Sequence, residues 1–180
     1  MSTAAMIPIT LLLATSDATY RLGERLGMAA SAGQIIALSG ELGAGKTTLT
    51  QGIAKGLGIS ARVTSPTFTL VNEYGAGTRR LRLIHIDTYR LSESASTALA
   101  EATTLGLDEI FATAPLSDSD SEGAIVIIEW AERITDLLPP DALYITLTTD
   151  PLDANVRIAT LTATGPKSSA LLAAVQHAVS

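Results

Sequence analysis

The residues from Gly40 to Thr47 read Gly-Glu-Leu-Gly-Ala-Gly-Lys-Thr, a complete phosphate-binding loop of the pattern G-x-x-x-x-G-K-[ST]. Its glycines allow successive backbone N–H groups to turn inward around an anion. Lys46 supplies a mobile positive charge for the β- and γ-phosphates of a nucleotide. The Thr47 hydroxyl is suited to ligating Mg²⁺. The loop follows the apolar run at 34–38 and opens a helical pattern, which is the context that the motif needs.

Two acidic residues are candidates to complete a hydrolytic site around this loop. Asp87 follows the apolar run at 83–86, and Glu129 follows the run at 125–128. In open α/β sheets, ligands bind where such strands end. Lys46, Asp87 and Glu129 are therefore the predicted catalytic residues. The alternative is that either acid only caps the next turn, and spacing does not decide which of them binds the metal or orients water.

Other polar segments allow more than one interpretation. The Ser65-Pro66-Thr67 segment lies about twenty residues after the loop, where a switch segment can sense the γ-phosphate, although a simple turn fits nearly as well. The arginines at 79, 80 and 82 could contact a partner or RNA, but a solvated hairpin face is favoured. His85 is interpreted as a packed or hydrogen-bonded strand residue rather than a catalyst. Trp130, taken by itself, would be interpreted as a core residue.

Composition narrows the function classes. The chain has 180 residues, 47% of them apolar, which predicts a single globular domain over residues 1–180. A net charge of −6 argues against a large nucleic-acid footprint. There are no cysteines and only two histidines, so thiolate or histidine-rich metal sites are not expected. The apolar stretch at 7–13 is too short to span a bilayer and predicts a strand, so a soluble cytoplasmic protein without membrane contact is expected.

Strands and helices are expected to alternate along the chain. Ser16-Asp17 is the expected N-cap of the first helix, Gly56 or Gly58 the expected end of the second, and Ser168 or Ser169 the expected cap of the last. Expected strands lie at 7–13, 34–39, 68–74, 81–87, 124–128, 143–148 and 157–163, and expected helices at 17–31, from 46, 92–104, 105–111, 131–138 and from 168 to 179. This pattern predicts a three-layer α/β P-loop NTPase fold with a mixed, largely parallel sheet and antiparallel hairpins.

Four segments, in the same order, resemble the bacterial TsaE (YjeE) ATPases of tRNA threonylcarbamoyladenosine biosynthesis. They are the loop at 40–48, Ser-Pro-Thr-Phe-Thr-Leu-Val at 65–71 with Glu73-Tyr74, His-Ile-Asp-Thr-Tyr-Arg-Leu at 85–91, and Ile-Glu-Trp at 128–130 followed by Leu138-Pro139. The resemblance is strong from about Gly33 to Pro139. The first segment is generic, but the set of four is specific.

The resemblance implies roles for individual residues. Thr47 and Glu129 would ligate Mg²⁺, and Asp87 would act in the hydrolytic site. Ser16 and Arg157 would approach the nucleotide from the first helix and a C-terminal strand. The residues implied to bind the nucleotide along the loop are Leu42, Gly43, Ala44, Gly45, Lys46, Thr47 and Thr48, and those implied in switching or partner contact are Ser65, Pro66, Thr67, Tyr89, Arg90 and Trp130.

The resemblance also implies a partner. The family works with the TsaD–TsaB pair, so tRNA would be met only indirectly. No guanine-reading Asn/Thr-Lys-x-Asp segment occurs, which favours ATP over GTP. Two other functions stay open: a small-molecule P-loop kinase, for which only the arginines at 79–82 could serve as a lid, and a non-catalytic ATP-sensing module. The Ser/Ala-rich segment at 92–104 and the acidic loop at 117–122 depart from the family pattern.

Overall fold

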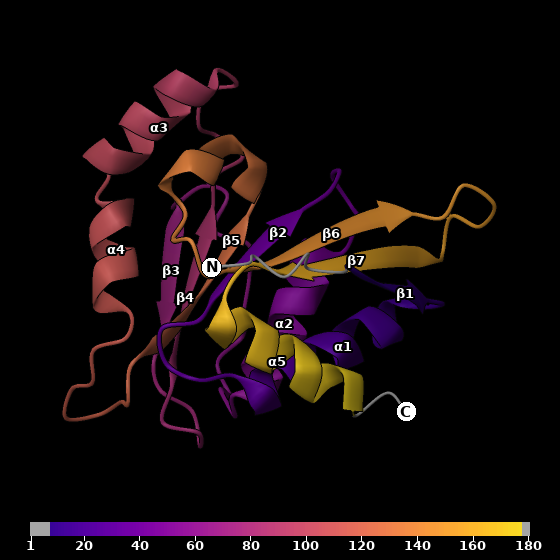
Figure 1. Ribbon diagram of the computed structural model, residues 1–180, viewed down its shortest axis with the longest axis horizontal. Coiled ribbons are helices and arrows are strands. Elements are labelled where there is room, and N and C mark those ends of the chain that lie inside the picture. The colour runs from indigo at the N-terminus through magenta and orange to yellow at the C-terminus, as the bar shows by residue number, and fades with distance from the viewer. Residues whose placement is uncertain (1–7, 178–180) are drawn as a thin grey trace, which may run out of the picture.

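The computed structural model describes residues 8–177 (Figure 1). Its strands are β1 (Ile9–Leu13), β2 (Ile35–Ser39), β3 (Val71–Tyr74), β4 (Arg82–Asp87), β5 (Ala124–Glu129), β6 (Leu143–Thr149) and β7 (Arg157–Ala163). Its helices are α1 (Ser16–Ala29), α2 (Lys46–Gly56), α3 (Ala95–Thr104), α4 (Leu107–Thr113), the 3₁₀ helix η1 (Ala131–Leu137) and α5 (Pro166–His177). None of these helices combines the length and apolar character that a membrane crossing requires.

The strands of this described part form one mixed sheet in the order β1-β7-β6-β2-β5-β4-β3. The central strands β6, β2, β5 and β4 run parallel to one another. β7 and β3 join them antiparallel at the two sides, and β1 pairs antiparallel with β7. The apolar residues of β5, from Ile125 to Ile128, have no exposed surface. Such a run is typical of a parallel strand that is covered on both faces.

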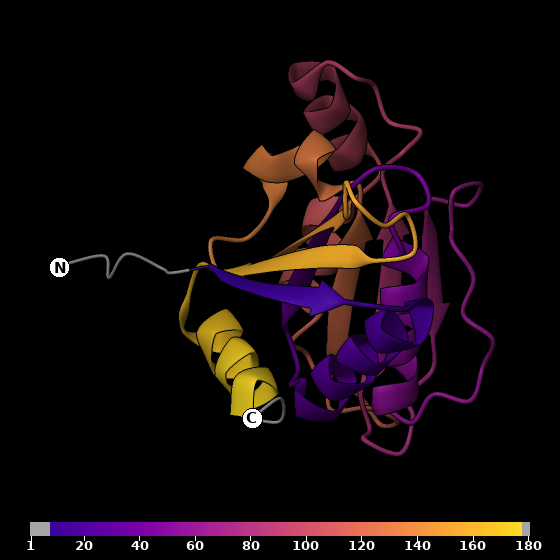
Figure 2. The ribbon, with the colours of Figure 1, turned by 90° about the vertical axis from the view of Figure 1, so that its right-hand side faces the viewer.

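Helices cover the two faces of the sheet and give the predicted three-layer α/β fold. The core on one face contains buried residues of α1, α2 and α5. The core on the other face contains buried residues of α3, α4 and η1. Figures 1 and 2 show these two groups of helices on opposite sides of the strands. The carboxyl ends of β2, β4 and β5 meet at one edge of the sheet because these strands are parallel.

Helices α1 and α2 pack with their backbones in contact. A Cβ atom added at Gly23 or Gly27 of α1 would overlap a carbonyl oxygen of α2, and one added at Gly52 or Gly56 of α2 would overlap a carbonyl oxygen of α1. Only glycine permits this approach. α2 ends at Gly56, as predicted, so Gly56 serves both this packing and the helix end. Leu57 is the C-cap, and Gly58, with φ of 75°, takes the left-handed position that follows it.

Some predicted boundaries were wrong. The N-cap of α1 is Thr15, whose hydroxyl accepts from the Ala18 N–H at 3.1 Å, and not Ser16-Asp17. β3 begins at Val71 because residues 67–70 form a turn. The helix at 131–137 is 3₁₀. The strand expected from Ile7 and the helix expected to Val179 have ends that lie outside the described residues.

The last helix, α5, is capped from a distance. It begins at Pro166, two residues earlier than expected. Asp141, which precedes β6, accepts hydrogen bonds from the backbone N–H groups of Lys167 at 2.8 Å and Ser168 at 2.9 Å. The Ser168 hydroxyl accepts from the backbone N–H groups of residues 164 and 165. Both Asp141 and Ser168 therefore fix the start of α5.

Candidate active site

A cleft of about 410 Å³ opens where the phosphate-binding loop meets the carboxyl ends of β4 and β5. Register places Asp87 of β4 directly beside Glu129 of β5, and Leu38 of β2 beside Glu129 on its other side. The loop at 40–45 starts one residue after β2 ends. The cleft is lined by Leu42, Gly43, Ala44, Gly45, Lys46, Thr47, Thr48, Ser65, Thr67, Asp87, Tyr89, Glu129 and Trp130.

The loop places Lys46 at the floor of the cleft. Gly45, the N-cap of α2, has φ of 105°, a conformation that residues with a side chain rarely adopt. Lys46 is buried, and its Nζ donates to the carbonyl oxygens of Gly40 at 2.6 Å and Glu41 at 2.9 Å. Nζ also lies 3.9 Å from the centre of the Trp130 ring, a cation–π contact. Burial lowers the pKa of Lys46, and the negative charges of Glu129, Glu132 and Asp87 partly oppose that shift.

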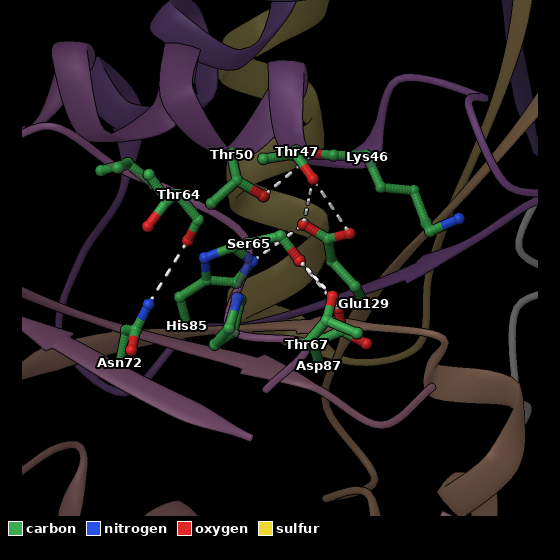
Figure 3. Close-up of polar contacts among 12 residues, drawn as sticks. Lys46, Thr47, Thr50, Thr64, Ser65, Thr67, Asn72, His85, Asp87 and Glu129 are labelled. Atoms are coloured by element: carbon green, nitrogen blue, oxygen red, sulfur yellow. Dashed lines mark hydrogen bonds and ion pairs between the residues drawn. The ribbon is translucent and has the colours of Figure 1, made fainter. Parts of the chain in front are cut away.

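Thr47 and Glu129 bring two oxygen donors together beside the loop (Figure 3). The Thr47 hydroxyl lies 3.0 Å from Oε1 and 3.3 Å from Oε2 of Glu129. Oxygen donors of this kind suit Mg²⁺, which proteins commonly bind through one or two side chains, with phosphate oxygens and water completing the shell. Among residues 8–177, no group of three acidic, histidine or cysteine side chains forms a metal site by itself. The pair therefore fits a metal that arrives with a phosphate ligand.

Asp87 is held by hydroxyl groups of the preceding loop. Its Oδ2 accepts hydrogen bonds from Thr67 Oγ1 at 2.6 Å and Ser65 Oγ at 2.8 Å, and its Oδ1 accepts from the Tyr89 N–H at 2.9 Å. The predicted switch segment and the predicted acid are thus in direct contact. An acid held by these donors can orient a water molecule or a hydroxyl in the cleft.

Trp130 adopts a left-handed backbone conformation, with φ of 61°, which is unusual for a large side chain. The buried Thr88 hydroxyl stabilises this turn by donating to the carbonyl oxygens of Trp130 at 2.7 Å and Glu129 at 3.1 Å. The turn directs the indole ring of Trp130 toward Lys46 and Tyr89. The ring centres of Trp130 and Tyr89 are 5.0 Å apart. The contact of Thr88 with the next strand was not predicted, because the sequence gives no sign of it.

A second, smaller cavity of about 90 Å³ lies on the other side of the loop. Ser16 and Arg157, which the resemblance implied, both line it. Arg157 donates to the Gly43 carbonyl oxygen at 3.3 Å. Thr19 and Asn155 also line this cavity and were not predicted, although each lies within three residues of a predicted one.

The remaining predicted residues lie outside the cleft. Pro66 is buried, and Arg90 lies over the exposed Phe68 ring, with its guanidinium carbon 6.0 Å from the ring centre. Arg79 donates to the Met28 and Ala30 carbonyl oxygens at the end of α1.

The other two arginines of this hairpin contact acids. Arg80 pairs with Glu122 at 3.4 Å, and Arg82 pairs with Asp118 at 3.5 Å. All three arginines make contacts within the chain, and none lines the cleft. A kinase-type lid over the cleft therefore gains no support from them.

Comparisons with known proteins point to one family. A family model described as threonylcarbamoyl adenosine biosynthesis protein TsaE matches residues 13–157. The tRNA threonylcarbamoyladenosine biosynthesis protein TsaE of Nostoc sp. is 43% identical over 122 residues, which cover 68% of this chain and 67% of the relative. Its namesake in Bacillus subtilis is 42% identical over 118 residues, which cover 66% of this chain and 63% of the relative.

A solved structure is similar over the full fold. The crystal structure of Bacillus subtilis YdiB superposes with a TM-score of 0.75 at 29% identity, covering 99% of this chain and 100% of that one. The layered sheet and the strand–loop–helix at 35–56 define the chain as a member of the P-loop NTPase fold class. Within that class, the chain belongs to the TsaE family, which takes part in tRNA threonylcarbamoyladenosine biosynthesis.

Proposed function

We propose that the chain binds Mg-ATP in the 410 Å³ cleft and hydrolyses it, as the ATP-driven subunit of the tRNA threonylcarbamoyladenosine machinery in the cytoplasm. The observation that carries this proposal is the contact between the Thr47 hydroxyl and the Glu129 carboxylate at the phosphate-binding loop. This contact brings the phosphate-binding loop and the acidic end of β5, which a nucleotide hydrolysis site both requires, within hydrogen-bond distance.

The loop binds the phosphates through its backbone. The N–H groups at the start of α2 and the positive end of the helix dipole favour an anion there. Lys46 exchanges its contacts with the Gly40 and Glu41 carbonyl oxygens for phosphate oxygens, and its stack against Trp130 keeps the ammonium group over the cleft. Thr47 and Glu129 hold Mg²⁺, which neutralises charge on the phosphates when bound.

The two acids have different tasks in this proposal. Glu129 is engaged with Thr47 and is assigned to the metal. Asp87 faces the cleft from the neighbouring strand and is assigned to orient the attacking water, with Ser65 and Thr67 fixing its carboxylate. A nucleotide that reorients the 65–67 loop would therefore also move the acid that positions water.

Docking on the TsaD–TsaB pair is supported by family membership and by the rim of the cleft. Leu42 and Tyr89, which line the cleft, are exposed, and so is Phe68, which follows the cleft-lining Thr67 in the chain. Large apolar side chains at such a rim are typical of a surface that a protein partner covers. The net charge of −6 fits tRNA contact that is made through the partners.

The test is ATP turnover with and without purified TsaD–TsaB, using Lys46→Ala and Lys55→Ala as a matched pair. Lys55 is exposed at the far end of α2. Lys46→Ala should lower turnover roughly 100-fold or more, because it removes a charge that is preorganised in the cleft, while Lys55→Ala should keep it. Equal turnover in both variants would remove the loop from the mechanism. Phosphate transfer to a small molecule would favour the kinase, and binding without any turnover would favour the sensing module.

A further inference from the structure

His85 is a fully buried residue of β4 that lies on the same face of the sheet as Asp87. Its Nε2 is 2.8 Å from Oε1 of Glu129, on the neighbouring strand (Figure 3). The Thr47 hydroxyl of α2 lies 3.0 Å from the same oxygen of Glu129. Oε1 of Glu129 therefore has two donors, one from the loop and one from beneath it.

The direction of the His85 hydrogen bond follows from chemistry. An ionised carboxylate only accepts hydrogen bonds, so Nε2 of His85 must carry the hydrogen. The other ring nitrogen, Nδ1, is buried and has no partner among the residues that the structure describes. The contact with Glu129 is therefore the one hydrogen bond that the His85 ring makes within residues 8–177.

A buried imidazole that makes only one hydrogen bond destabilises the fold relative to an apolar side chain at the same position. Burying a polar group costs free energy unless it is hydrogen-bonded, and the unpaired Nδ1 bears that cost here. The neighbouring buried positions of β4 are Leu83, Ile84 and Ile86, so an apolar side chain would suit the sheet better. The imidazole gives Glu129 something that an apolar residue cannot, namely a fixed donor on one carboxylate oxygen.

We propose that His85 is a positioning residue for Glu129, a role that rests on the proposed function. By holding Oε1, His85 fixes the carboxylate plane and keeps Oε2 and the remaining lone pairs turned toward Thr47 and the cleft. Partners of this kind behind a metal ligand typically change metal affinity or activity 10- to 100-fold when removed. The expected effect of losing His85 is therefore a roughly 10- to 100-fold higher Mg²⁺ requirement, with little change in nucleotide affinity when Mg²⁺ is saturating.

Three substitutions separate this role from plain packing. His85→Leu removes the donor, His85→Gln places an amide N–H near the position of Nε2, and His85→Asn carries the same amide on a shorter chain that reaches only the Nδ1 position. We expect the Mg²⁺ concentration for half-maximal turnover to rise in the Leu and Asn variants and to return toward the wild-type value in the Gln variant. The melting temperature of each variant is measured alongside, because a packing role would follow stability rather than donor position.

The results divide cleanly. The positioning role is supported if the Mg²⁺ requirement is raised in the Leu and Asn variants and close to the wild-type value in the Gln variant. Unchanged Mg²⁺ dependence in folded His85→Leu overturns it while leaving the proposed ATPase intact. A Mg²⁺ dependence that follows melting temperature across all three variants also overturns it.

A second measurement needs neither nucleotide nor metal. The sequence has only two histidines, so ¹⁵N-labelled imidazole NMR gives two ring systems, and His177→Gln assigns them. We expect His85 to show the hydrogen on Nε2 in the wild-type protein, with the chemical shift of a hydrogen-bonded group, and we expect that shift to change in Glu129→Ala because the acceptor is lost. An identical His85 spectrum in both proteins would overturn the inference. If the wild-type protein showed no Mg-ATP turnover, the proposed function would fail, and this spectrum would still decide whether His85 holds Glu129.

Discussion

Asp87 and Glu129 sit side by side at the same step of the β4–β5 ladder, yet their surroundings differ. Glu129 contacts Thr47 in the first turn of α2 and His85 of β4, so both contacts come from regular elements. Asp87 contacts Ser65 and Thr67, which lie in the irregular segment between α2 and β3.

This difference shows how one sheet edge can hold two acids with separate tasks. An acid that is fixed by elements of the core keeps one geometry, which suits a metal ligand. An acid that is fixed by a loop takes its geometry from that loop, so a ligand that orders the loop also orders the acid. Substitutions in each acid and in the residues that hold it separate the two tasks.

Glu129→Gln tests the fixed acid. The amide keeps the shape of the side chain but loses the charge, so the stabilisation that a metal ligand provides, worth several kcal/mol, is removed. We expect turnover with TsaD–TsaB to fall about 10²- to 10³-fold and the Mg²⁺ requirement to rise, with ATP still bound. Steady-state turnover over a Mg²⁺ titration measures the turnover rate and the Mg²⁺ requirement. Turnover within twofold of wild type would contradict the role of Glu129 as a metal ligand.

Asp87→Asn tests the acid held by the loop. Loss of a residue that orients or deprotonates water lowers turnover roughly 100-fold, while the Mg²⁺ requirement stays at the wild-type value. Asp118→Asn, an acid in the loop before β5 that pairs with Arg82, serves as the control with an equal change in charge. A raised Mg²⁺ requirement in Asp87→Asn would mean that the two acids share the metal and do not have separate tasks.

Thr67→Val tests whether the loop controls Asp87. The substitution removes the shorter of the two hydroxyl contacts to Oδ2, at 2.6 Å, and keeps the shape of the side chain. A hydrogen bond to a charged group is worth about 1.5–3 kcal/mol, and the lower end of that range corresponds to a fall in turnover of about tenfold, which we expect because Ser65 still holds the same oxygen. Ser65→Ala, which removes the contact at 2.8 Å, is the companion variant. If both variants turned over ATP at the wild-type rate, Asp87 would not depend on the loop.

Asp141→Ala should have no effect on turnover, because Asp141 caps α5 and lies outside the cleft. It serves as the control for an acid whose role is structural. Losing a helix cap costs about 1 kcal/mol of stability, measured by denaturant unfolding, and turnover should not change. Burial alone would raise the pKa of Asp141, but its hydrogen bonds from Ser168 and Lys167 outweigh that and lower the pKa. The stabilisation is therefore present above the ordinary aspartate pKa and is lost as pH falls through the lowered value. The wild type and the variant should converge in strong acid, and a constant gap would contradict this origin.

The sequence predicted the parts of the site that are local in the chain. The strand, loop and helix around Lys46 follow from residue types and short spacing alone. The meeting of Asp87 with Glu129 follows because each ends an apolar strand, and parallel strands end at one edge. These inferences needed no knowledge of which side chains touch.

The parts that were missed depend on distant contacts. Asp141 caps a helix that begins 25 residues later, at Pro166, and its own neighbours give no sign of this. Thr88 makes its hydrogen bonds to the carbonyl oxygens of Glu129 and Trp130, about forty residues away. His85 is buried and hydrogen-bonded as expected, but its partner, Glu129, was not predicted. The choice of Thr15 over Ser16 as N-cap was missed for a different reason, since two adjacent hydroxyl residues have nearly equal capping ability.

The glycines between α1 and α2 set a mechanical condition on the site. Side chains between two helices can repack when one helix shifts. The backbones of α1 and α2 are in direct contact, with no side chains between them to repack, so we expect the two helices to move together as one rigid unit. α2 begins at the phosphate-binding loop, and α1 begins beside the smaller cavity with Ser16 and Thr19. We therefore expect the starts of α1 and α2, which lie at the two cavities beside the loop, to keep a fixed spacing.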